Sequence, residues 1–182
     1  MKKFELTSEF VTFLGKKLFR IKALVSFGDV KEGELGGLVE KEENLDQSGN
    51  AWVYGDARVY GDARVYGNAW VYGNAWVSGD AWVSGDARVY GDARVYGNAW
   101  VSGDARVQNC RDYSATSCFG SENRTTTFFR TKDGGISVRC GCFYGTLAEF
   151  REKVKERHGG RRLAKEYLML ADLMEFRLSK DE

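Results

Sequence analysis

Four cysteines are the residues of this chain best suited to bind a metal or to act as nucleophiles. They all follow residue 108, in the order Cys110, Cys118, Cys140 and Cys142. Four thiols suit a structural zinc site, but the C-x7-C and C-x-C spacings lack the paired CxxC knuckles typical of such sites. We therefore expect reduced, partly buried thiols and no cofactor. Structural zinc is the second interpretation, and redox or nucleophilic chemistry is the third.

One histidine is present, and it is the only candidate for a general base of the imidazole type. His158 lies in the sequence Lys155-Glu156-Arg157-His158-Gly159, where a helix is predicted to end. A cation at that position complements the helix dipole, so a capping or solvated role explains it without catalysis. We assign no catalytic residue.

A segment rich in arginine, hydroxyl groups and phenylalanine is the best candidate for binding a small anion. Charge-assisted hydrogen bonds and stacking could there hold a phosphorylated or nucleotide-like ligand. Residues 109–182 carry 14 basic and 11 acidic residues, a mild net charge of +3. The alternative is a structural strand whose phenylalanines fill the core. The candidate ligand-binding residues are Arg124, Thr126, Phe128, Arg130 and Arg139.

These candidates must be positioned by a fold that an internal repeat largely determines. Residues 49–108 form ten consecutive hexads, Gly-(Asn/Asp)-Ala-(Trp/Arg)-Val-(Tyr/Ser/Gln), without an insertion. Alternating Ala and Val indicate short strands with one buried face, and Gly with Asn or Asp indicates a turn. A six-residue period does not fit a helix of 3.6 residues per turn. We therefore predict a triangular parallel solenoid with three hexads in each coil.

Stacked coils place every third hexad in one row, so the outer faces should be aromatic. Arg at the fourth position of a hexad always follows Asp at the second, whereas Trp follows Asn except in Asp80-Ala81-Trp82. Mutual stacking of Arg, Trp and Tyr is one interpretation, and a protein-binding surface is the other. The residues of the candidate surface are Trp52, Trp70, Tyr54, Tyr72, Tyr90 and Arg88.

Two non-repetitive segments flank the solenoid. Residues 1–48 are expected to form a β cap and an imperfect first coil that cover the open end. Residues 109–182 are expected to form strands over 112–119, 125–131 and 136–143, then two helices. A capping box at Thr146-Leu147-Ala148-Glu149 starts the first helix. The second, about 162–179, is apolar around too much of its circumference for one packing partner, so we expect Leu168 and Ala171 to meet a neighbouring subunit.

The hexads, for example Val53-Tyr54-Gly55-Asp56-Ala57-Arg58, resemble the repeat of left-handed parallel β-helix proteins. The resemblance implies a mainly β fold: a left-handed parallel β-helix with an N-terminal β cap and a C-terminal ββαα module. Proteins of this kind are commonly trimers. Many are acyltransferases that bind acyl-coenzyme A between coils and use a histidine as base, but their looped-out insertion is absent from these hexads.

The whole chain also resembles uncharacterised bacteriophage and prophage proteins that carry the label "putative transferase". The resemblance rests on the repeat and on three further stretches: Leu18-Phe19-Arg20-Ile21 with Gly33-Glu34-Leu35-Gly36-Gly37, Arg124 to Arg130, and Cys140 to Thr146. It implies a phage-type protein and no known chemistry.

Length and charge limit the possible functions. A chain of 182 residues is long enough for a real core, and a net charge of +1 gives no global attraction to nucleic acid or membranes. Its first residues lack the apolar stretch of a signal peptide, and no segment approaches the roughly 20 apolar residues of a membrane span, so we expect a cytoplasmic protein.

We expect a non-enzymatic homotrimer that captures a host protein or a small anionic ligand, in the manner of a host-defence inhibitor. The alternatives are an acyl-coenzyme A-dependent acyltransferase and a virion structural component.

Overall fold

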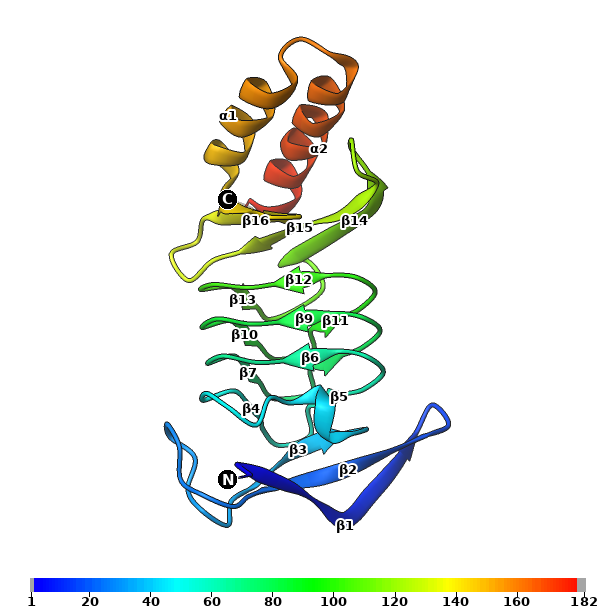
Figure 1. Ribbon diagram of the computed structural model, residues 1–182, viewed down its shortest axis with the longest axis vertical. Coiled ribbons are helices and arrows are strands. Elements are labelled where there is room, and N and C mark those ends of the chain that lie inside the picture. The colour runs from blue at the N-terminus through cyan, green and yellow to red at the C-terminus, as the bar shows by residue number, and fades with distance from the viewer. Residues whose placement is uncertain (1, 180–182) are drawn as a thin grey trace.

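The computed structural model describes residues 2–179. Flat coils are stacked in the middle of the molecule, with a β hairpin at one end and a sheet carrying two helices at the other (Figure 1). This arrangement confirms the predicted fold class, a mainly β solenoid with a β cap and a C-terminal module that contains two helices.

The solenoid strands contain two residues each. They are β4 (Trp52–Val53), β5 (Arg58–Val59), β6 (Arg64–Val65), β7 (Trp70–Val71), β8 (Trp76–Val77), β9 (Trp82–Val83), β10 (Arg88–Val89), β11 (Arg94–Val95), β12 (Trp100–Val101) and β13 (Arg106–Val107). All of them pair in parallel, in the orders β4-β7-β10-β13, β5-β8-β11 and β6-β9-β12. Each strand therefore pairs with the strand three hexads later, as the repeat predicts.

Alanine and valine fill the solenoid interior, and glycine forms its corners. Every Ala and Val of the ten hexads is at most 1% exposed. At the corner formed by Gly85 the backbone has φ +66°, and an added Cβ would lie 2.8 Å from the amide nitrogen of Gly103 in the next coil. The corner therefore needs glycine for both its left-handed conformation and its close stacking.

The N-terminal cap consists of β1 (Phe4–Phe13), β2 (Lys16–Ala23) and β3 (Leu35–Val39), followed by the short 3-10 helix η1 (Glu42–Asn44). Strand β3 pairs antiparallel with β2 and parallel with β5, so the cap continues one sheet of the solenoid. The cap covers Trp52, which is fully buried, with the rings of Phe4 and Phe27 at 6.2 and 5.3 Å. The assignment of Trp52 to an exposed interaction surface was therefore wrong.

The C-terminal sheet has four antiparallel strands rather than the three expected. They are β14 (Tyr113–Phe119), β15 (Arg124–Arg130), β16 (Ile136–Cys140) and β17 (Phe143–Thr146). The predicted strand over 136–143 divides at Gly141, whose φ of +57° lets the chain turn back within two residues so that Cys140 pairs with Phe143. Helices α1 (Leu147–His158) and α2 (Arg162–Leu178) follow.

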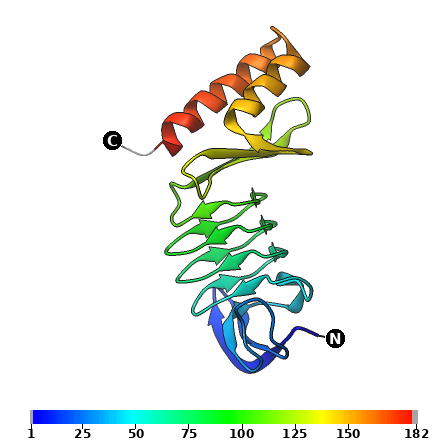
Figure 2. The ribbon, with the colours of Figure 1, turned by 90° about the vertical axis from the view of Figure 1, so that its left-hand side faces the viewer.

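The two faces of this sheet pack against different partners (Figure 2). Phe129 and Tyr113 belong to the solenoid core, and the Thr127 hydroxyl accepts a hydrogen bond from the Trp100 amide at 3.0 Å. Phe128 and Val138 instead pack with residues of both helices. The sheet is therefore a plate between the last coil and the helical layer. Within residues 2–179, neither helix has the length and apolar character needed to cross a membrane.

Candidate functional site

A cavity of about 590 Å³ lies where the β16–β17 end of the sheet meets both helices. Its wall combines cationic, aromatic and thiol side chains. The lining residues are Ser121, Glu122, Arg124, Cys140, Gly141, Cys142, Phe143, Tyr144, Phe150, Lys153, Val154, Arg157, His158 and Tyr167. We call this cavity the cationic cleft.

Helix α1 supplies one wall of the cationic cleft. Its first turn is fixed by the expected capping box, in which the Glu149 amide donates to the Thr146 hydroxyl at 3.2 Å and the Thr146 amide donates to the Glu149 carboxylate at 2.7 Å. The buried residues Phe150 and Val154 hold the helix against the sheet. Lys153 and Arg157 follow these positions by three residues, which turns the two cations toward the cleft.

The β16–β17 turn and the loop before β15 supply the opposite wall. A Cβ added to Gly141 would lie 3.0 Å from Nη1 of Arg124, so the guanidinium group lies against this turn. The nearest acid is Glu122, with its carboxylate 4.0 Å from Arg124 Nη2. Both side chains are more than half exposed, so this ion pair is weak and leaves the guanidinium free to meet a ligand.

Cys140 and His158 both lie beside Tyr167, and all three residues line the cleft. The Tyr167 hydroxyl accepts a hydrogen bond from the Ser121 amide at 3.3 Å, and its ring stacks on His158 with centroids 5.6 Å apart. Burial raises the pKa of Tyr167, and the nearby Cys140 thiol adds to this effect. Tyr167 therefore stays a neutral donor at neutral pH.

The cleft carries more positive than negative charge. Arg124, Lys153 and Arg157 face the single carboxylate of Glu122. Lys153 also pairs with Glu156 at 2.8 Å on the exposed side of α1, whereas Arg157 makes no ion pair with any residue in the described range 2–179. Such an arrangement suits a small organic anion whose apolar part lies against the aromatic rings.

Two of the predicted ligand-binding residues are buried in the sheet. Thr126 and Phe128 are fully inaccessible. The Thr126 hydroxyl donates to the Cys140 thiol at 3.2 Å, and Phe128 packs against Phe150 with ring centroids 5.8 Å apart. Their assignment to a ligand site was wrong because helices cover this face of β15.

The predicted ligand arginines fall in three different places. Arg130 donates to the carbonyl oxygens of Leu178 and Ser179 at 2.8 Å each and pairs with Asp112 at 3.2 Å, so it anchors the end of α2. Arg139 lies on the solenoid side of the sheet, with its guanidinium carbon 3.7 Å from the centre of the Trp100 ring. Neither Arg130 nor Arg139 lines the cationic cleft, and Arg124 is the one of the five predicted residues that does.

The four cysteines are free thiols and do not form one cluster. Cys140 and Cys142 line the cationic cleft, whereas Cys110 and Cys118 are exposed elsewhere. Among residues 2–179, no group of three or more His, Cys, Asp or Glu side chains is placed to hold a metal ion. The four thiols therefore do not form the zinc site that was the second interpretation.

The cationic cleft is also lined by Lys153, Arg157, Phe143 and Tyr167, which the sequence did not single out as ligand-binding residues. A signal for the cations was present, because Lys153 and Arg157 are four residues apart and must share a face of α1. The aromatic residues gave no comparable signal, since each of them also fits an ordinary core position.

The residues of the predicted solenoid surface mostly contact one another. The Arg88 guanidinium lies 3.8 Å from the centre of the Trp70 ring, and Tyr54 packs against Trp70 at 5.2 Å. Tyr72 and Tyr90 stack with an interplanar angle of 7°. These contacts favour the interpretation in which the ladders stabilise neighbouring coils.

Helix α2 does have a second apolar face, but other residues form it. Ala171 is fully buried and Leu168 packs against the core of the C-terminal module, so both point inward. The exposed face consists of Met169, Leu173 and Phe176, which are 72%, 57% and 84% exposed. The assignment of Leu168 and Ala171 to an interaction surface was wrong because neighbouring helix positions, three and four residues apart, form that face.

Comparison with known proteins supports the solenoid. The family model described as YdcK Beta solenoid repeat matches residues 57–73, 69–85 and 87–103, all of which lie within the stacked coils. No curated protein matches the chain. The matched repeats and the parallel ladders together identify this chain as a β-solenoid repeat protein.

Proposed function

We propose that this chain is a non-enzymatic binding protein whose cationic cleft captures a small, nucleotide-like anion. The observation that carries this proposal is the convergence of Arg124, Lys153 and Arg157 on one aromatic-lined cavity. The volume of about 590 Å³ lies within the range typical of small-molecule sites.

The two kinds of lining residue suit the two parts of such a ligand. The guanidinium and ammonium groups can neutralise a phosphate and donate hydrogen bonds to it. Phe143 and Tyr144 line the same cavity and offer rings on which a base can stack. A ligand with both parts is therefore expected to bind more tightly than either part alone.

The position of the histidine favours binding over the acyltransferase alternative. His158 lies at the end of α1, outside the solenoid coils, and its ring stacks on Tyr167. A coil-bound acyl donor in the manner of the hexapeptide family would lie in a different part of the molecule. We accordingly assign His158 to the wall of the cleft.

The biological setting that we propose is capture of a signalling nucleotide in a bacterial host cell. Support comes from the resemblance of the chain to phage and prophage proteins, for which sequestering such a signal would inhibit host defence. We also propose that the chain is a homotrimer. The exposed Met169, Leu173 and Phe176 face of α2 supports this second part.

Isothermal titration calorimetry with ADP, adenosine and inorganic phosphate tests the binding proposal. We expect ADP to bind more tightly than adenosine or phosphate. Lys153→Ala should weaken ADP binding about tenfold, the loss expected when one charge-assisted hydrogen bond is removed.

Lys155→Ala is a matched control for Lys153→Ala. Both lysines are on α1, are equally exposed and pair with a glutamate at 2.8 Å, but Lys155 does not line the cleft. ADP affinity should change by less than about twofold in this control. Equal losses in the two variants, or the absence of ADP binding to the unmodified protein, would contradict the proposal.

A further inference from the structure

The hexad that contains Trp82 departs from the pattern of the repeat. It is the single hexad in which Trp rather than Arg follows Asp, as Asp80-Ala81-Trp82. Its register neighbours are Arg64 in the preceding coil and Trp100 in the following coil. Trp82 therefore stands where the repeat would place a cation.

Trp82 also differs from the other exposed or half-buried tryptophans because no cation among the described residues covers its ring, which the Trp100 ring contacts edge to face with centroids 5.1 Å apart. Guanidinium carbons lie 3.8, 4.5 and 3.7 Å from the ring centres of Trp70, Trp76 and Trp100, and Trp52 is fully buried beneath the cap. Trp82 is 38% exposed, and none of the cations in residues 2–179 lies over its ring. A guanidinium group that stacks on Trp82 must therefore come from another molecule.

The Trp82 ring borders a groove of about 610 Å³ on the solenoid face formed by β6, β9 and β12. Tyr66 meets Trp82 edge to face, with ring centroids 6.0 Å apart and an interplanar angle of 85°. The two aromatic rings are therefore nearly perpendicular to each other. The rest of the wall includes the carboxylates of Glu42, Glu43 and Asp46. The lining residues are Glu42, Glu43, Leu45, Asp46, Gln47, Arg64, Val65, Tyr66 and Trp82. We call this the acidic groove.

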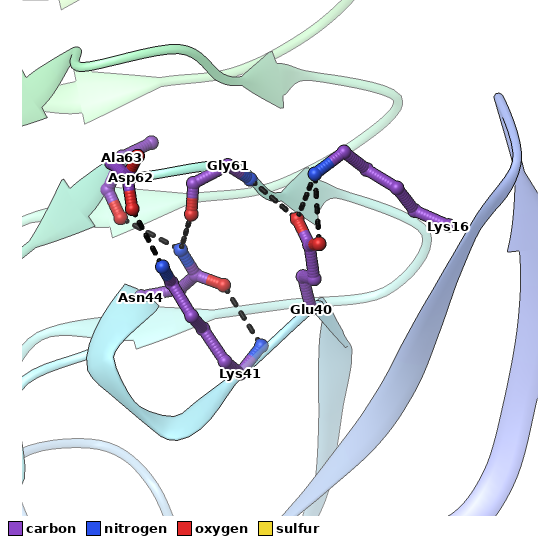
Figure 3. Close-up of polar contacts among 7 residues, drawn as sticks. All are labelled: Lys16, Glu40, Lys41, Asn44, Gly61, Asp62 and Ala63. Carbon is purple, nitrogen blue, oxygen red and sulfur yellow. Dashed lines mark hydrogen bonds and ion pairs between the residues drawn. The ribbon is translucent and has the colours of Figure 1, made fainter.

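The acidic wall is held rigidly by contacts between η1 and a solenoid corner (Figure 3). The buried Asn44 amide donates to the carbonyl oxygens of Gly61 and Ala63 at 3.0 and 2.8 Å. The Lys41 ammonium pairs with Asp62 at 2.6 Å. The backbone amide of Lys41 donates a hydrogen bond to the side-chain oxygen of Asn44 at 3.0 Å. The wall is therefore formed before a ligand arrives.

The carboxylates of the wall differ in what they already bind. Glu42 pairs with Lys2 at 2.8 Å, and Asp46 accepts hydrogen bonds from the amide and hydroxyl of Ser48. Glu43 is exposed and makes no ion pair with any residue that the structure describes. Of the three carboxylates, that of Glu43 is therefore available to a ligand, although Arg64 also lines the groove and lowers its net negative charge.

From this geometry we propose that the acidic groove binds an arginine side chain of a partner protein. The guanidinium plane stacks on Trp82, as the chain's own arginines stack on its other tryptophans, and its N–H groups donate to Glu43. This interaction surface is separate from the cationic cleft and does not depend on the nucleotide proposal.

Nuclear magnetic resonance of the Trp82 indole N–H, with N-acetyl-arginine amide as the probe, tests this inference. The probe should shift that resonance saturably and leave the indole resonance of buried Trp52 unchanged. N-acetyl-citrulline amide, which has the same shape without the charge, should produce no saturable shift. Equal shifts with both probes, or the absence of a shift at Trp82, would overturn the inference.

Two variants separate binding from folding. Trp82→Arg gives the first five residues of its hexad the sequence Gly-Asp-Ala-Arg-Val that five other hexads have, so this variant should fold and lose the probe-induced shifts at the Tyr66 amide. Glu43→Gln keeps the indole reporter and should weaken binding about threefold, whereas Glu152→Gln on α1 removes the same charge far from the groove and should not. Unchanged affinity in both groove variants would overturn the proposal. A change in the oligomeric mass of Trp82→Arg would also overturn it, because the groove would then belong to a second copy of the chain.

Discussion

At the N-terminal end of the solenoid, β3 extends the sheet of β5, β8 and β11, whereas at the C-terminal end the β14–β17 sheet lies across the last coil. The N-terminal hairpin leaves most of β1 exposed. The C-terminal sheet is covered on both faces, by the solenoid on one and by the helices on the other. The second covered face is what creates the cationic cleft, so the proposed anion site lies at the C-terminal end.

The two ends also satisfy their unpaired backbone groups differently. Within the solenoid, the alanine carbonyls accept hydrogen bonds from the preceding coil, as Ala69 does from the Trp52 amide at 3.0 Å. The first hexad has no repeat before it, and there the buried Lys3 ammonium donates to the Ala51 carbonyl at 2.9 Å. The last coil instead receives backbone hydrogen bonds from the C-terminal segment, such as Lys132 N to Asp104 O at 3.0 Å.

The largest effects should come from the two phenylalanines on opposite faces of β15. Both are fully buried, so Phe128→Ala and Phe129→Ala should each lower the free energy of unfolding by about 3–5 kcal/mol. All five tryptophans lie in the solenoid and both helices in the C-terminal module, so fluorescence and circular dichroism at 222 nm report different regions. In urea, Phe128→Ala should lose helix before solenoid fluorescence changes, and Phe129→Ala should shift both signals together. Joint loss of both signals in Phe128→Ala, or separate loss in Phe129→Ala, would contradict the packing of the two sheet faces against different layers.

A smaller effect is expected at the N-terminal end, where burial lowers the pKa of Lys3 to about 8 despite the nearby Asp46. Between pH 8 and 10.5 the unfolded chain holds this proton and the folded chain does not, so stability rises with pH. Compared with Lys3→Met, the unmodified protein should gain up to about 3 kcal/mol across this range. Chemical denaturation of both proteins at pH 8 and 10.5 measures the difference, in which the contributions of the tyrosines cancel. A constant difference would show that Lys3 is not desolvated.

The capping box of α1 should contribute about 1 kcal/mol, so Thr146→Ala should lower the unfolding free energy by about that amount. Thr146→Ser keeps the hydroxyl that accepts from Glu149 N and serves as the control. Thermal unfolding followed at 222 nm measures the change. Equal losses in both variants would show that the methyl group, and not the cap, matters.

The smallest effect on monomer stability is expected on the exposed face of α2. Phe176→Ser should change the unfolding free energy by no more than about 0.5 kcal/mol, because the ring is 84% exposed. In the proposed homotrimer, the same change should reduce the mass measured by sedimentation velocity toward that of a single chain. Lys165→Ser, also exposed on α2, is the control. An unchanged mass in Phe176→Ser would contradict association through this face.

The solenoid could be predicted because its repeat constrains every coil in the same way. Glycine every six residues, with Ala and Val between, permits few other chain paths, and the predicted rows match the observed ladders. Trp52 shows the limit of this reasoning. It occupies the same hexad position as Trp70, but contacts with cap residues distant in sequence, including Phe4 and Phe27, help to bury it.

The candidate site was harder to predict because it depends on tertiary packing. In β15, the consecutive Thr126, Thr127, Phe128 and Phe129 are all buried, so the usual alternation of inward and outward residues is lost. A strand buried on both faces cannot present those side chains to a ligand. Arg124, at the exposed start of the strand, kept its predicted access because the helices do not cover it.

Chemical-shift mapping of the labelled protein with ADP tests most directly whether the C-terminal end alone is the nucleotide site. We expect saturable shifts at the cleft residues of the β16–β17 turn and of α1, such as Cys142, Lys153 and Arg157. The amides of β1 to β3 and of the acidic groove should stay unchanged. Saturable shifts at the N-terminal end, or the absence of shifts at the cationic cleft, would contradict the account.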